Sequence, residues 1–108
     1  MKSDNTKAQM RKGILELCIL SILKKDPKYS SEILITLKES KLIVVEGTIY
    51  PLLTRLKNTN LLEYKWKESS NGPPRKYYNI TDEGKVFLKD INDSWLELSS
   101  AVTKIRNK

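Results

Sequence analysis

The segment from Met10 to Leu23 carries apolar residues at helical spacing on two different sides. The first side consists of Met10, Ile14, Leu17 and Ser21, and the second of Leu15, Cys18, Ile19 and Ile22. A helix that is apolar on two sides is buried on two sides. Because a chain of 108 residues builds one interior, the second side predicts contact with another chain. Residues 1–9 lack such a pattern, so we expect a flexible N-terminus there.

Two further helices are predicted before residue 60. The first is capped by Ser30 or Ser31, ends near residue 41 and has one apolar side, formed by Ile33, Leu34 and Leu37. The second begins near Glu46, since four apolar residues have the spacing of a buried helical stripe: Ile49, Leu52, Leu53 and Leu56. Asn60 follows this helix, and asparagine tolerates the left-handed conformation that often ends one.

Alternating strands, a turn and a long helix complete the chain. The segment Leu62–Trp66 alternates apolar and charged side chains, Ser69–Pro74 is rich in turn-forming residues, and Arg75–Ile80 can form the return strand. Thr81 is expected to cap a last helix that begins at Asp82 and runs to about residue 105. Its apolar residues alternate steps of four and three, as in a coiled coil: Ile91, Trp95, Leu98, Val102 and Ile105.

Three helices followed by a two-stranded hairpin predict a winged helix-turn-helix. The fold class is therefore mainly α with a small β-hairpin (α+β), extended by a long C-terminal helix. We divide the chain into a flexible N-terminus over residues 1–9, a winged helix-turn-helix domain over 10–81 and a long C-terminal helix over 82–108. The apolar residues left to pack against another helix or chain are Met10, Ile14, Leu17, Ile91, Trp95, Leu98, Val102 and Ile105.

The amino-acid composition limits the kinds of chemistry that the chain can perform. The chain has 20 Lys and Arg against 13 Asp and Glu, and the net charge of +7 favours an anionic partner such as nucleic acid. The absence of histidine excludes imidazole catalysis, and a single cysteine, Cys18, excludes an internal disulfide or a thiolate zinc cluster. The apolar run over residues 13–23 contains Glu16 and is too short to span a bilayer. We therefore expect a cytoplasmic protein that is not an enzyme and needs no cofactor, metal or membrane.

The third helix and the hairpin turn are candidate DNA contacts. With Ile49 buried, helix geometry turns Pro51, Thr54 and Arg55 outward and leaves Thr48 and Tyr50 at the margins, so this face could read base edges in a major groove. The alternative is an ordinary solvated helix face. The turn places the cations Arg75 and Lys76 beside a stiff tip that could follow the DNA backbone or enter a minor groove. The alternative there is an ordinary basic hairpin.

Three segments carry a resemblance to a known family. The stretches Gly13–Leu17, Glu46–Leu56 and Gly72–Gly84 resemble, in this order, the signatures of the PadR family of bacterial transcription regulators, over roughly residues 10–96. The single C-terminal helix resembles the short class of that family. The resemblance implies a homodimer that binds an inverted-repeat operator and usually represses. It makes residues 82–108 the dimerisation helix, and the apolar residues named above on the first and last helices would form the dimer interface. The positions it implies for DNA contact are Thr48, Tyr50, Pro51, Thr54, Arg55, Gly72, Pro73, Arg75 and Lys76.

The aromatic residues suggest a ligand and a competing function. Some short members resemble drug sensors in which a tryptophan of the last helix lines a central cavity, and Trp95 occupies the corresponding place, where it could stack on a small aromatic or cationic effector. The alternative is that Trp95 fills the dimer core. Trp66 is interpreted as hairpin packing. A winged-helix module that binds RNA or a protein is also compatible with Tyr77 and Tyr78. An enzyme is the least favoured hypothesis, because the carboxylates are scattered along the sequence.

Overall fold

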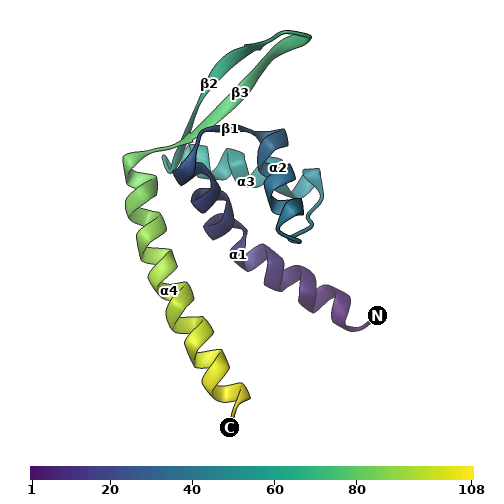
Figure 1. Ribbon diagram of the computed structural model, residues 1–108, viewed down its shortest axis with the longest axis vertical. Coiled ribbons are helices and arrows are strands. Elements are labelled where there is room, and N and C mark those ends of the chain that lie inside the picture. Colours follow the sequence, from purple (N-terminus) through teal and green to yellow (C-terminus); the bar gives the residue numbers. More distant parts are fainter.

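The computed structural model describes residues 1–108, apart from the side chain of Ser69. Its elements, in chain order, are the helix α1 (Ser3–Lys25), the strand β1 (Lys28–Tyr29), the helices α2 (Ser30–Glu39) and α3 (Glu46–Asn58), the strands β2 (Leu62–Ser69) and β3 (Gly72–Ile80), and the helix α4 (Asp82–Arg106). The β2–β3 hairpin projects from the helical body, and α4 leaves the same end of that body and runs beside α1 (Figure 1). The mainly helical winged helix-turn-helix fold with a long last helix is thereby confirmed.

The core lies where one side of α1 meets α2, α3 and the base of the hairpin. Leu15 and Ile19 of the predicted second side are buried there, whereas Cys18 and Ile22 are only half-buried at its border, and Leu20 and Leu23 join the core instead. The side chains of Leu15, Ile19, Leu20 and Leu23 are almost fully buried there. They pack with residues from the other elements: Ile33, Leu37, Ile49, Leu53, Leu56, Leu62, Tyr78, Ile80 and Leu88. Each of these apolar groups is removed from water, which stabilises the fold by roughly 1.5–3 kcal/mol per large side chain.

One helix end and one helix start are held by the residues that the sequence predicts, Asn60 and Thr81, and a second helix end is held by a residue that it does not predict. Asn60 has φ 64°, which confirms the left-handed position after α3, and the N–H of Leu61 then bonds the carbonyl of Leu56 at 2.9 Å. Lys41 has φ 69° and ends α2 in the same way. The hydroxyl oxygen of Thr81 accepts from the N–H of Gly84 at 2.9 Å, so Thr81 caps α4 as expected.

The sheet has three antiparallel strands in the order β1-β3-β2, where the sequence predicted two. The register pairs Tyr64 with Tyr78 and Trp66 with Lys76 across the hairpin, while Tyr29 pairs with Tyr77 at the other edge. The two residues of β1 are too few to show a period-two pattern. Their pairing depends on the position of β3, more than forty residues away, so no local signal reveals it.

Two predicted helix starts were wrong. The first helix begins at Ser3 instead of Met10, so residues 3–9 continue α1 in place of a flexible segment. They show no apolar stripe because they are almost entirely exposed, and a polar helical extension leaves no such pattern. The second helix is not capped by either predicted serine. Tyr29 is its N-cap, and Glu32 accepts a hydrogen bond from the Tyr29 N–H at 2.9 Å.

One side of the molecule exposes apolar residues. The α4 stripe, which we define as Ile91, Trp95, Leu98, Val102 and Ile105, has exposed fractions of 42% at Trp95 and 62% at Leu98. On the first side of α1, Met10 is 68% exposed. The two helices diverge toward their free ends (Figure 1), and a cavity between them is lined by Met10, Ile91, Trp95 and Leu98. Within the described residues, none of the helices has both the length and the apolar character that crossing a membrane requires.

Candidate nucleic-acid interface

The helix α3 presents a narrow polar face to solvent. Burial of Ile49, Leu53 and Leu56 fixes its orientation, and at 100° per residue the opposite side is centred between Pro51 and Asn58. We define the α3 outer face as the exposed residues on that side: Gly47, Pro51, Thr54 and Asn58. None of them is large, so a groove wall could approach this face closely.

The remaining predicted contacts of α3 lie at its two flanks. Tyr50 is 45% exposed on the flank toward the hairpin, and Thr48 is half-buried on the flank toward α1. Arg55 shares the α1 flank, where its Nη2 donates to Oε1 of Glu16. Arg55 is therefore partnered in this DNA-free chain. Sequence reasoning missed Glu16, because the two residues are 39 positions apart and no local pattern links them.

The proline in α3 lies inside the helix. Pro51 is the sixth residue of the helix that begins at Glu46, beyond the first turn where a missing N–H is least costly. Its ring therefore takes the place of a donor to the Gly47 carbonyl, one turn earlier. Both residues are exposed on the α3 outer face, where water can hydrate that carbonyl.

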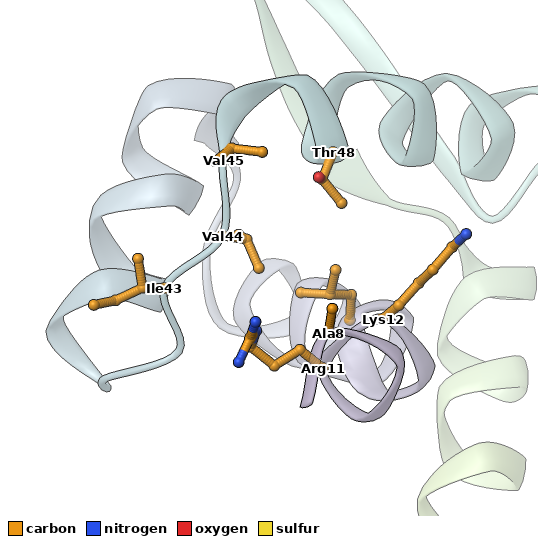
Figure 2. Close-up of a pocket in the computed structure, with 8 residues that line it drawn as sticks. Ala8, Arg11, Lys12, Ile43, Val44, Val45 and Thr48 are labelled. Atoms are coloured by element: carbon orange, nitrogen blue, oxygen red, sulfur yellow. The ribbon is translucent and has the colours of Figure 1, made fainter. Parts of the chain in front are cut away.

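Cations from α1 border the start of α3. A cavity of about 290 Å³ lies between the two helices, lined by Ala8, Arg11, Lys12, Leu15, Ile43, Val44, Val45 and Thr48. In Figure 2 the guanidinium of Arg11 turns toward the loop that precedes α3, whereas the ammonium of Lys12 extends away from that loop. Lys12 also borders a depression that includes Thr48, Pro51 and Arg55. The α1 flank of α3 is thus positively charged apart from Glu16.

The hairpin separates its two predicted cations. Adjacent residues of a strand point to opposite faces, and Arg75 and Lys76 follow this rule. Arg75 packs 4.1 Å from the ring centre of Tyr29 and donates to the hydroxyl of Ser31 at 3.5 Å. Lys76 lies on the other face, 4.8 Å from the ring centre of Tyr64.

The predicted tip residues lie at the far end of the hairpin. Gly72 and Pro73 are exposed and begin β3. Their distance from the core leaves them free to contact a large partner, as Figure 1 shows for the projecting hairpin.

The groove between α1 and α4 contains Trp95. A cavity of about 380 Å³ is lined by residues of both helices, including Met10, Ile14, Leu17, Trp95 and Leu98. Glu16 also lines this cavity, so the residue that pairs with Arg55 borders the groove as well. The volume falls in the range of small-molecule sites, which are mostly apolar with a few polar groups.

The titratable groups offer little for catalysis. Burial raises the pKa of the Cys18 thiol, which keeps it protonated and a poor nucleophile. Burial is also the main cause of the raised pKa of Tyr78, with smaller effects from Tyr64 and Tyr50. No cluster of three or more His, Cys, Asp or Glu suited to a metal ion occurs among the residues described.

Comparison with known proteins agrees with this architecture. The family model described as "Transcriptional regulator PadR-like family" matches residues 19–90. The chain is 59% identical to a PadR-like transcription factor from Bacteroides fragilis, with a TM-score of 0.79 and coverage of 94% of this chain and 99% of that one.

Two further solved structures are similar across the whole fold. A PadR-like transcriptional regulator from Bacillus cereus is 43% identical, with a TM-score of 0.79 and coverage of 90% and 95%. A PadR family transcriptional regulator from Eggerthella lenta is 32% identical, with a TM-score of 0.86 and coverage of 94% and 88%. The family match spans the core, the helix-turn-helix, the hairpin and the first part of α4. This chain therefore belongs to the PadR-like family of transcriptional regulators, and it acts as a regulator and not as an enzyme.

Proposed function

We propose that this protein is a homodimeric repressor that inserts α3 of each protomer into the major groove of an inverted-repeat operator. The observation that carries this proposal is the α3 outer face. It is polar, small and exposed, and it is bordered by α1 cations on one flank and by the hairpin on the other. Thr48, Tyr50, Pro51, Thr54 and Arg55 would approach bases and the adjoining phosphates. Gly72, Pro73, Arg75 and Lys76 of the hairpin would contact the neighbouring backbone.

The exposed apolar residues of α1 and α4 are the reason for proposing a second protomer. The α4 stripe, together with Met10, Ile14 and Leu17 of α1, presents apolar side chains that a single chain leaves exposed or half-buried. A continuous exposed apolar patch of this kind usually marks an interaction surface. A coiled-coil spacing on α4 favours a second copy of the same helix as the occupant. In such a dimer the two α3 helices should sit roughly 34–36 Å apart, one turn of duplex, so the operator should have two matching halves.

The groove beside Trp95 is the proposed effector site. Dimerisation would close this groove with the partner's α4, which would place two tryptophan rings near the molecular twofold axis. A flat aromatic or cationic ligand could stack between those rings, and Glu16 at the edge could balance a positive charge. Ligand binding would then change the spacing of the two α3 helices and release the operator.

Footprinting and gel-shift titration test the proposal. The probe is duplex DNA from upstream of the protein's own gene, and the expected footprint is a pair of related sequences. If each protomer neutralises about four phosphates, log K should fall with log salt with a slope near −7, from roughly −0.9 for each phosphate. Replacing Arg75 and Lys76 by alanine should flatten that slope by about 1.8 for each protomer. Absence of duplex binding at low salt, or a slope near zero, contradicts the proposal.

A further inference from the structure

One exposed tryptophan is not among the residues of the proposed function. Trp66 on β2 is 63% exposed, although the other aromatic residues on the same face are more deeply buried, with Tyr78 5% exposed. Trp66 meets Tyr64 edge to face, with ring centres 5.7 Å apart. It lies beyond the part of the hairpin that packs on the core. Trp66 packs within the hairpin, against Tyr64 and near Lys76, and most of its surface still remains free.

The face that carries Trp66 continues directly from α3. The ammonium group of Lys57, on α3, lies 5.8 Å from the ring centre of Tyr64. The ammonium group of Lys76 lies 4.8 Å from the same ring and 5.7 Å from the ring of Trp66. These side chains form a row that leads outward from the helix, which we call the wing row: Lys57, Tyr64, Lys76 and Trp66.

We propose that the wing row holds the sugar–phosphate backbone of the duplex whose major groove receives α3, with Trp66 as the outermost contact. This inference rests on the proposed function and adds residues that it does not contain. Two positive charges at the row match a polyanion. The flat indole ring can pack on a deoxyribose, and its Nε1–H can donate to a phosphate oxygen. The surface continues from the α3 outer face through Lys57, so one strand could cross both.

The position of the row argues against a second protein copy as its occupant. The apolar residues left exposed on α1 and α4 are the surface suited to dimerisation, and that surface lies away from the hairpin (Figure 1). The wing row combines two aromatic rings with two lysines. Lysine is depleted in the core of protein interfaces, whereas it suits contact with phosphate groups.

Tryptophan fluorescence can report on this contact. The chain contains two tryptophans, so replacing one of them leaves the other as the reporter. In the variant Trp95→Phe, Trp66 is the remaining fluorophore. A mixed-sequence duplex at low salt is a sufficient probe, since backbone contacts do not depend on sequence. We expect binding of this duplex to quench or shift the Trp66 emission. In the matched variant Trp66→Phe, where Trp95 remains, the same duplex should change the emission far less.

Affinity measurements complete the test. Trp66→Ala should weaken duplex binding by about tenfold, the scale of one hydrogen bond to a charged phosphate group. Lys57→Ala and Lys76→Ala should each reduce the salt slope by about 0.9 for each protomer. Because the Trp66 side chain is largely exposed, circular dichroism and melting should show that the Trp66→Ala variant remains folded. Trp66→Phe should retain part of the lost affinity.

The possible failures are distinct. If the wild-type chain binds no duplex, the proposed function and this inference both fail. If it binds duplex while Trp66→Ala binds equally well and the Trp66 emission stays constant, this inference is overturned and the proposed function stands. If a single-stranded oligonucleotide changes the Trp66 emission more than the duplex does, the row stacks on unpaired bases and the duplex contact is overturned.

Discussion

Arg55 of α3 donates a hydrogen bond through Nη2 to Oε1 of Glu16 on α1. Both side chains are partly exposed, by 62% and 31% respectively. An exposed ion pair contributes about 0–1 kcal/mol, whereas a bidentate arginine–guanine contact contributes roughly 1–3 kcal/mol of discrimination. In the proposed complex, Arg55 would therefore exchange Glu16 for a base edge with a net gain, and Glu16 would be a weak competitor for that contact.

The first prediction concerns this competition. Arg55→Ala should lower operator affinity by roughly 1–3 kcal/mol and relax one base preference. Glu16→Gln should raise operator affinity by up to about 1 kcal/mol, because Arg55 no longer leaves an ion pair. A double-mutant cycle measured by gel shift separates this effect from the general loss of a negative charge. An equal gain from Glu16→Gln in the Arg55→Ala background would show that the two residues are not coupled.

The second prediction concerns the α4 stripe. Leu98→Asp should place an unpaired charge in the proposed dimer interface and raise the dimer dissociation constant by about 100-fold or more, given the ~3–5 kcal/mol cost of an uncompensated buried charge. Ser100→Asp is the matched control, since Ser100 is exposed on the opposite side of α4. Light scattering over a range of concentrations measures both variants. A Leu98→Asp protein that stays as dimeric as the control would place the interface elsewhere.

The third prediction concerns the junction between the hairpin and α4. A Cβ at Gly84 would overlap the backbone carbonyl oxygen of Leu61 and lie 2.7 Å from Cγ1 of Ile80. Gly84→Ala should therefore destabilise the fold by roughly 1–3 kcal/mol, as overpacking does. Gly47→Ala is the control in open space, and it should stabilise α3 by about 0.5–1 kcal/mol. Urea unfolding measures the stability of both variants against the wild type. A Gly84→Ala variant as stable as the wild type would show that α4 can shift to admit the methyl group.

The fourth prediction concerns alkaline pH. Burial raises the pKa of Tyr78, so the folded chain holds this proton more tightly than the unfolded chain does. The stabilisation is fully present below the ordinary tyrosine pKa of about 10 and is lost as pH rises from there through the folded pKa. Tyr78→Phe should lose less stability than the wild type across that interval. Unfolding measured from pH 8 to pH 11, expressed as the difference between the two proteins, isolates Tyr78 from the lysines, which are present in both.

The sequence alone was sufficient for most of the architecture. Several features depend on hydrogen bonds or side-chain spacing within a few residues, so a short stretch of sequence is enough to predict them. They are the helix periods around Ile49 and Leu98, the cap at Thr81 and the left-handed Asn60. The same locality explains the failures. Residues 3–9 form a helix without an apolar stripe, and β1 is too short to have a pattern.

The alternation of side chains between the two faces of a strand also bears on the predicted cations of the hairpin. Period two already places Arg75 and Lys76 on opposite faces, although both were expected at one contact surface. The structure adds what each face meets, namely Tyr29 and Ser31 on one side and Tyr64 on the other.

Only the tertiary structure decided which distant residues meet. The sequence determined that α3 exposes a polar side and that α4 carries an apolar stripe, because both follow from neighbours along one helix. The pairing of Arg55 with Glu16 and the row from Lys57 to Trp66 depend instead on how separate elements pack in space. That packing is set by burial of the whole core, which is non-directional and shared among all elements, so no short stretch of sequence encodes it.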